Sequence, residues 1–253
     1  MQPTGHTPDL EPALLTAERL LEWRRRSGPN SDAPFPPNVI VTHQPSVFRA
    51  LVPRFKSRAL PGLSTPLRTI ERGRIAVALP AIGASATAML VDELAVRGVR
   101  LVSAVDLCAS ISPDVPSGVV VLVESACCGD GTSPHYAPGR QFVEANKALV
   151  ELLASTLEFA GVPFLRGRVW STDAPYRETP SLLQRAREAG ALGIDMETSA
   201  FYAAGSASDS VACVSVLVTA DRLLDAWQPP SDMSAVNAML RRIAGVVLSS
   251  QRS

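Results

Sequence analysis

Short runs of apolar, often β-branched residues alternate with longer stretches of helical spacing from Asn38 onward. Short apolar runs of this kind predict buried strands, and apolar residues recurring every three to four positions predict helices. The predicted strands are Val39–Thr42, Ile75–Leu79, Leu101–Val105, Val119–Glu124, Phe164–Trp170 and Val211–Thr219. The predicted helices are Ala84–Arg97, Phe142–Ala160, Pro180–Ala189, Thr198–Gly205 and Ser234–Ser249. Such alternation predicts an α/β fold with a mixed central β-sheet flanked by helices on both faces.

The first 37 residues have a different pattern. Residues Leu10–Arg26 have helical spacing with a basic end at Arg24-Arg25-Arg26, and residues Gly28–Pro37 are rich in proline, serine and asparagine. This pattern predicts an added helix and a linker. We therefore predict an N-terminal extension of residues 1–37 and one α/β domain of residues 38–253. The three arginines are interpreted as the solvated end of a helix and not as a binding patch.

Composition agrees with a single compact globular protein. The 253 residues are 46% hydrophobic and carry 24 basic and 24 acidic side chains, so the formal net charge is zero and there is no electrostatic footprint for nucleic acid. No apolar run approaches the roughly 20 residues that span a bilayer, and the first residues do not form a signal segment. We expect a soluble, cytoplasmic protein without a membrane partner.

The cysteines and histidines do not suggest a metal or cofactor site. Cys108, Cys127, Cys128 and Cys213 lack the spacing of metal ligands, and adjacent cysteines have poor geometry for a disulfide, so reduced thiols are expected. No His-x-x-x-His, paired-cysteine or Walker-type pattern occurs. We therefore expect no metal and no cofactor.

Two carboxylates stand one position apart in the segment Gly193–Ala200, at Asp195 and Glu197. In an extended segment their side chains would point the same way and Met196 the other way. One carboxylate could then accept hydrogen bonds from the neighbouring hydroxyls of a sugar. The alternative is capping of the following helix and compensation of its dipole.

Four further segments complete a recognisable series: Gly83–Leu94, Asp130–Pro138, Gly167–Thr179 and Val214–Leu223. In order and spacing, these motifs resemble the nucleoside phosphorylase superfamily over residues 38–248. The resemblance implies that family's three-layer fold. It also implies cleavage or formation of the N-glycosidic bond of a nucleoside, and assembly as a homo-oligomer, either a trimer or a hexamer.

The resemblance also implies roles for individual residues. Glu197 would bind the ribose hydroxyls and stabilise the cationic transition state. Asp221 would protonate a purine-like leaving base, although it could instead cap a helix. Asp173 and Arg177 would mainly shape their loop. The remaining candidates for substrate binding are Asp195, Met196, Thr172, Pro175 and Tyr176.

The first departure from the family is the turn Thr42–Val47. The family's phosphate cradle begins with a Gly-Asp-Pro-x-Arg type of turn, and here His43 replaces the glycine and Val47 the arginine. A subgroup of the family has a Gln-Pro turn at this point, so this change alone is compatible with membership. His43 is a candidate for substrate binding or for activation of water.

The second departure lies in the segment Val102–Ile111, where Ala104 replaces an arginine and Asp106 a glycine. An aspartate repels phosphate, so phosphate binding should be impaired unless another cation compensates. Such a cation could come from a neighbouring subunit or from Arg49, Arg68 or Arg74.

Three hypotheses follow for the function. The first is an N-glycosidic-bond enzyme, which would be either a phosphorylase with an unusual anion site or a nucleosidase whose water is activated by Asp106 or His43. The second is a redirected enzyme in specialised metabolism, with Asp106 as a new acid or base on a non-nucleoside substrate. The third is a non-catalytic binding protein, in which Asp106 reflects drift in an abandoned site.

Overall fold

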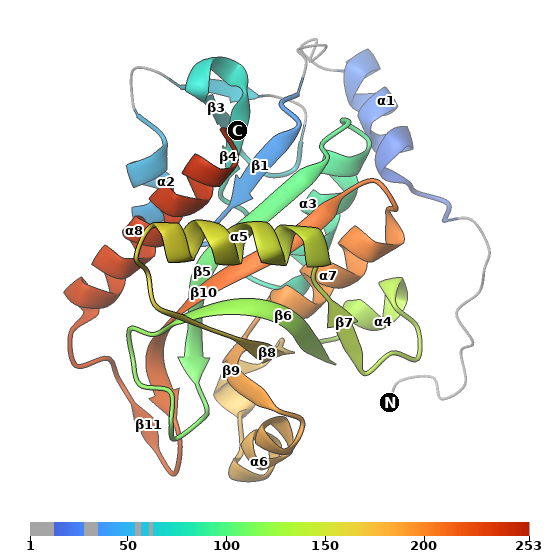
Figure 1. Cartoon of the computed structure of the whole chain (residues 1–253). Coiled ribbons are helices and arrows are strands. Elements are labelled where there is room, and N and C mark those ends of the chain that lie inside the picture. The colour runs from blue at the N-terminus through green and yellow to red at the C-terminus, as the bar shows by residue number, and fades with distance from the viewer. Residues whose placement is uncertain (1–12, 28–34, 54–56, 61–62, 253) are drawn as a thin grey trace.

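The structure, a computed structural model, describes residues 13–27, 35–53, 57–60 and 63–252. A twisted mixed sheet lies at its centre with helices on both faces, as Figure 1 shows, so the predicted fold class is confirmed. The strands are β1 (Asn38–Val41), β2 (Arg58–Leu60), β3 (Leu67–Ile70), β4 (Ile75–Ala78), β5 (Leu101–Ser110), β6 (Val120–Gly129), β7 (Phe142–Glu144), β8 (Phe164–Thr172), β9 (Ala191–Asp195), β10 (Ala212–Leu223) and β11 (Trp227–Gln228).

The helices form two layers around this sheet. They are α1 (Ala17–Ser27), α2 (Pro45–Leu51), α3 (Ala84–Ala95), α4 (Ser133–Tyr136), α5 (Lys147–Phe159), α6 (Pro180–Glu188), α7 (Thr198–Ala207) and α8 (Met233–Ser250), with 3₁₀ turns at Glu71–Gly73 and Pro175–Arg177. Helices α5 and α8 cross the front of the sheet in Figure 1, while α3 and α7 lie against its other face. Among the described residues, no helix combines the length and apolar character needed to cross a membrane.

The pairing of the strands brings the candidate residues together. Strand β5 is parallel to both β1 and β10, and it is also paired with β9. Strands β5, β10, β6, β8 and β9 close a ring, because β10 pairs with β6 and β8 pairs with both β6 and β9. Ligands of α/β sheets bind at the carboxyl ends of parallel strands. The adjacent carboxyl ends of β1, β5 and β10 are therefore the expected position of a ligand-binding site.

The core is built from strands that are apolar on both faces, as expected for parallel strands covered by helices. Val39, Ile40 and Val41 of β1 are almost completely buried. Tyr202 of α7 is also buried, and its hydroxyl donates to the Val123 carbonyl at 2.8 Å and accepts from the Ser215 amide at 2.9 Å. This hydroxyl fixes α7 to the neighbouring strands β6 and β10.

The structure corrects several predicted boundaries. The segment predicted as one helix over Phe142–Ala160 contains strand β7, and helix α5 starts only after Asn146, whose side chain accepts from the Leu149 amide. Pairing of β7 with β6 overrides the helical spacing here. Strands β5, β6 and β10 also run several residues beyond their predicted ends. The sequence did not predict the short elements β2, β3, β9, β11, α2 and α4.

The predicted N-terminal helix starts later than expected, at Ala17, and the first residues of the prediction, Leu10–Pro12, lie outside the described part. Most of the predicted linker, residues 28–34, also lies outside it. Helix α1 packs against α3. Its Arg24 donates to Glu93, whose side chain is 1% exposed, at 2.9 Å. Arg24 therefore docks the extension onto α3, and its interpretation as part of a solvated helix end is wrong.

Replacing Arg24 with alanine should measurably destabilise the protein. Removing one partner of a buried ion pair costs about 3–5 kcal/mol. We expect about 1–2 kcal/mol here, since Arg24 is partly exposed and Ser64 still donates to Glu93 through its amide and its hydroxyl. This corresponds to a Tm lower by roughly 3–8 °C in thermal unfolding. The control is Arg26→Ala, which removes a highly exposed helix pair with Glu22. Equal Tm values for the two variants would contradict the docking role.

Candidate active site

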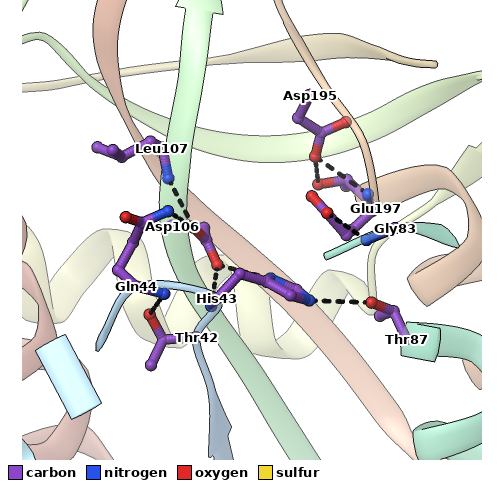
Figure 2. Close-up of polar contacts among 10 residues, drawn as sticks. Thr42, His43, Gln44, Gly83, Thr87, Asp106, Leu107, Asp195 and Glu197 are labelled. Carbon is purple, nitrogen blue, oxygen red and sulfur yellow. Dashed lines mark hydrogen bonds and ion pairs between the residues drawn. The ribbon is translucent and has the colours of Figure 1, made fainter. Parts of the chain in front are cut away.

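The turn after β1 sets His43 and Gln44 against Asp106 of β5. Parallel pairing aligns Val41 with Ala104, so the residues two positions further along meet as well. Oδ2 of Asp106 accepts the His43 amide at 2.6 Å and His43 Nδ1 at 2.8 Å. Oδ1 accepts Gln44 Nε2 at 2.9 Å and the Leu107 amide at 3.1 Å. Figure 2 shows both oxygens of Asp106 occupied in this way, so Asp106 orients its neighbours and has little capacity left to activate water.

His43 links Asp106 to α3. Its Nε2 lies 3.1 Å from the hydroxyl of Thr87, and the chain Asp106–His43–Thr87 has the residue types of a nucleophilic triad. Thr87, however, is 2% exposed and does not line the main cavity described below, so its hydroxyl is not presented to a substrate there. Burial lowers the pKa of His43, but the hydrogen bond and charge of Asp106, with the charges of Glu197 and Asp195, outweigh burial and raise it above 6.5. His43 can therefore carry a positive charge beside these acids.

Asp195 and Glu197 have separate roles. Strand β9 ends at Asp195, so the extended alternation predicted for the two acids does not continue to Glu197. Oδ1 of Asp195 accepts from the Ser171 hydroxyl at 2.6 Å, while Oδ2 accepts from the amide of Thr198 at 3.0 Å and from its hydroxyl. Asp195 therefore caps α7 and ties β9 to β8. It borders the cavity, but its oxygens already have protein donors.

Glu197 remains available to a ligand. Its Oε1 accepts from the Gly83 amide at 2.8 Å, and Gly83 has a φ of 121° that favours glycine. Its side chain does not cap α7. Burial raises the pKa of Glu197 to about 7, with a further contribution from Asp195 and Asp106, against the lowering effect of His43 and Gly83. A carboxyl group that changes charge near neutrality thus faces the cavity.

These side chains border a cavity of about 690 Å³. A volume of this size is typical of a small-molecule site, in which apolar walls surround a few polar groups. The polar and titratable lining residues are His43, Gln44, Asp106, Cys108, Tyr176, Glu178, Asp195, Glu197, Asp221 and Trp227. The other lining residues are Ile82, Leu107, Ala109, Pro175, Ile194, Met196, Ala220 and Leu223.

Asp221 and Glu178 occupy a second acidic region of the wall. Asp221 lies near the end of β10, and its Oδ2 accepts from the Trp227 indole N–H at 2.7 Å. Trp227 belongs to β11, which pairs with β10, so the hairpin itself supplies this donor. Glu178 follows the 3₁₀ turn of residues Pro175–Arg177 and is half-buried. Burial and the charge of Asp221 raise the pKa of Glu178 to about 7.

The structure places most of the predicted substrate-binding residues on this cavity. Pro175, Met196 and the highly exposed Tyr176 line it, together with His43 and Glu197. Thr172 does not: it is buried at the end of β8, and its hydroxyl accepts from the Ala174 amide at 3.2 Å. The predicted contact of Thr172 with a substrate is therefore not supported, because its side chain is used to shape the following turn.

The remaining sequence motifs hold loops together. Asp130 is buried and accepts from the amides of Thr132 and Ser133 and from the hydroxyls of Ser133 and Ser199. Asp173 accepts from the Gly131 amide at 2.7 Å, so it joins this loop to the end of β8 as the loop-shaping interpretation predicts. These contacts fix the loops around α7 and leave the chemistry to the residues on the cavity.

The lining of the cavity is predominantly acidic. Its lining contains five carboxylates, one histidine and, within the described residues, neither lysine nor arginine. Arg49, Arg68 and Arg74 do not line it, and Arg68 instead donates to Ser57. In the part of the chain that the structure describes, no group of three or more His, Cys, Asp or Glu side chains could hold a metal ion.

Comparison with known proteins shows which family the chain belongs to. A family model described as the phosphorylase superfamily matches residues 50–250. The chain belongs to the phosphorylase superfamily. This confirms the predicted family and assigns the chain to a family of enzymes. The turn that carries His43 and Gln44 precedes the matched residues, so the most unusual part of the site lies where the family model does not extend.

Individual members of the phosphorylase superfamily are similar over most of the chain. A DeoD-type purine nucleoside phosphorylase from Bacillus cereus is 27% identical over 168 residues, which cover 65% of this chain and 70% of the Bacillus protein. The crystal structure of an AMP nucleosidase from Bacteroides thetaiotaomicron superposes with a TM-score of 0.72 at 19% identity, covering 92% of this chain and 97% of that one. Uridine phosphorylase from Vibrio fischeri gives 0.73 at 23% identity, with 86% and 92% covered. These two structures support the fold alone, and the oligomeric state, the cellular location and the division at residue 37 stay predictions.

Proposed function

We propose that this phosphorylase-superfamily member cleaves the N-glycosidic bond of a purine-like nucleoside with water as the acceptor. The observation that carries the proposal is the acidic wall of the cavity, which lacks lysine and arginine among the described residues. At an effective dielectric constant of about 20, two like charges about 4 Å apart cost on the order of 4 kcal/mol. That equals roughly the whole binding free energy of a millimolar ligand. Repulsion from the carboxylates therefore weakens the binding of phosphate, whereas neutral water is not repelled.

Glu197 is our proposed ligand for the ribose hydroxyls. The Gly83 amide holds one of its oxygens at 2.8 Å, which leaves the other oxygen to accept from a sugar hydroxyl. Loss of a base from C1′ builds positive charge on the sugar. A carboxylate fixed beside that charge stabilises the transition state more than the ground state.

The water would bind at the corner formed by Gln44, His43 and Asp106. Gln44 donates its amide N–H to Asp106, so its carbonyl oxygen can accept from a water molecule at the cavity surface. Asp106 holds the backbone and ring of His43 and the side chain of Gln44 in fixed positions. We assign Asp106 the role of positioning this corner, which refines the predicted activation of water by Asp106 or His43.

The base would lie at the region of the wall that contains Asp221. Trp227 and Tyr176 are exposed aromatic residues of the same cavity, and aromatic faces suit the stacking of a planar base. Protonation of the leaving base by Asp221 stays a prediction from the sequence. The structure adds that Asp221 is fixed by Trp227 and that Glu178 shares this region.

Release of free base from a panel of purine and pyrimidine nucleosides tests the proposal. We expect release from a purine nucleoside at the same rate with and without added phosphate or arsenate, measured by chromatography in phosphate-free buffer. A rate that rises in proportion to phosphate would show a phosphorylase and overturn the choice of water. No release from any nucleoside would contradict the proposed reaction and favour a redirected enzyme or a binding protein.

A further inference from the structure

We propose that Glu178 is the group that protonates the leaving base, and that Asp221 anchors the base as a hydrogen-bond acceptor. The two carboxyl groups line one cavity from different elements, β10 and the loop after β8, and lie close enough for the charge of Asp221 to act on Glu178. The inference rests on the proposed cleavage of an N-glycosidic bond. It transfers to Glu178 the proton-donating role that the sequence predicts for Asp221.

The hydrogen bond at Asp221 indicates which of the two groups is the acceptor. An indole N–H can only donate, so Oδ2 of Asp221, 2.7 Å from the Trp227 nitrogen, accepts in this contact. A carboxylate held by a donor in this way is suited to receive a further N–H from a base. Trp227 is fixed in turn by the pairing of β11 with β10.

Glu178 has the opposite surroundings. Within the described residues its carboxyl group has no hydrogen-bond donor, and it is half-buried beside Asp221. A carboxyl group without donors, next to another acid and partly removed from water, is favoured in its neutral form. Two acids whose surroundings favour different protonation states are the usual arrangement of a proton donor and its charged neighbour. Burial and Asp221 raise the pKa of Glu178 to about 7, which agrees with this assignment.

The step is balanced without any further reactant. The C1′–N bond breaks and its electron pair moves to the base, whose ring nitrogen takes the proton of Glu178. The oxygen of water forms a bond to C1′. One water proton passes to solvent, and Glu178 regains a proton from solvent, so the net reaction adds water across the bond.

The test compares two leaving groups in the Glu178→Gln variant. Adenine must be protonated to leave adenosine, whereas 4-nitrophenolate leaves 4-nitrophenyl β-D-ribofuranoside without a proton. We expect kcat for adenosine to fall by about 50-fold, somewhat below the usual contribution of 100-fold or more from a general acid, because Asp221 can partly substitute. We expect kcat for the nitrophenyl riboside to stay within about 3-fold of the wild-type value.

Two further variants make the test conclusive. Glu178→Asp keeps a carboxyl group and should cleave adenosine at least about 5-fold faster than Glu178→Gln, even if the nitrophenyl riboside is not a substrate. Glu158→Gln, an exposed change on α5, is the matched control and should behave as wild type. Equal losses on both substrates, or no loss on adenosine, would overturn the role of Glu178 while the proposed hydrolysis stands. Wild-type protein that releases no base from any nucleoside would overturn both.

Discussion

Replacing Glu197 with glutamine is expected to lower kcat/KM for nucleoside cleavage by about 100- to 1000-fold. The glutamine keeps the shape of the side chain, and its carbonyl oxygen can still accept from the Gly83 amide, so the fold should be retained. What is lost is a negative charge beside the developing cation on the sugar. A charge about 4 Å away contributes on the order of 4 kcal/mol at an effective dielectric constant of about 20. Initial rates with a purine nucleoside measure the effect.

The matched control for this substitution is Glu188→Gln, which changes an exposed residue of α6. It should leave kcat/KM unchanged. If the Glu197→Gln variant kept more than about a tenth of wild-type kcat/KM, charge stabilisation by Glu197 would be smaller than a single ordinary catalytic interaction. The proposed position of the sugar would then be wrong.

The pH dependence of kcat/KM follows from the same residue. Burial raises the pKa of Glu197 to about 7, so the carboxyl group is neutral below this pH and ionised above it. Because Glu197 is active when ionised and the proposed donor Glu178, whose pKa is also raised to about 7, is active when protonated, kcat/KM should pass through a maximum near neutral pH, and its rising limb should belong to Glu197. His43, Asp195 and Asp106 all act on the pKa of Glu197, and the pKa of His43 is itself raised by Asp106. Comparing the pH profiles of kcat/KM for the wild type and Glu197→Gln identifies this limb, because the increase due to ionisation of Glu197 should be absent from the variant.

The sequence predicts the layers of this fold better than its boundaries. Val39–Val41 is a continuous apolar run, and Val214–Thr219 is nearly so, with Ser215 and Thr219 as its polar residues. Such runs are typical of strands buried on both faces, and the two segments are found in β1 and β10. The segment Phe142–Ala160 misleads because its helical spacing continues across β7. The Asn146 cap is the only local signal of the boundary. Five-residue β9 has no distinctive pattern, since it is positioned by its partners β8 and β5.

The site could be predicted by residue type but not by role. Asp195 and Glu197 look equivalent in the sequence, yet Ser171, 24 residues away, binds the first and Gly83, 114 residues away, binds the second. Such long-range partners leave no local signal. Glu178 was missed because it lies in a segment interpreted as a loop-shaping motif. The proposed role of Glu178 depends on the nearby charge of Asp221, which lies 43 residues further along the chain, on β10. Gln44 was missed because only its contact with Asp106 gives it a role.

Removing Asp106 should also inactivate the enzyme, by a different route. We expect Asp106→Ala to lower kcat by about 100-fold or more, a loss of the size that follows when a general acid or base is misplaced. Asp106 fixes three groups at the proposed water corner: the His43 backbone, the His43 ring and the Gln44 side chain. Without it the ring and the amide lose their fixed geometry. KM should change less than kcat, because Glu197 and Asp221 are held by hydrogen bonds from Gly83 and Trp227 and not by Asp106, His43 or Gln44.

A positioning role predicts a spectroscopic change as well as a loss of rate. The pKa of His43 stands above 6.5 because Asp106 outweighs burial, so removing Asp106 should lower it. The ring protons of His43 in a wild-type NMR titration should shift at a higher pH than in Asp106→Ala. With only three histidines in the chain, the spectrum of His43→Gln identifies the signal. The conservative variant Asp106→Asn, measured beside Asp106→Ala, separates loss of charge from loss of packing.

Drift in an abandoned site makes the opposite prediction for Asp106. A residue without a role in turnover could be replaced with little change in kcat, provided that the variant folds. The buried amide of His43 and the partly buried amide of Leu107 lose an acceptor in Asp106→Ala. A buried group left unsatisfied costs about 1–3 kcal/mol, so circular dichroism and thermal unfolding must accompany the rates. A folded variant with full activity would remove Asp106 from the mechanism. A folded variant with a lowered His43 pKa and a kcat reduced about 100-fold would support the proposed role of Asp106 in positioning His43 and Gln44.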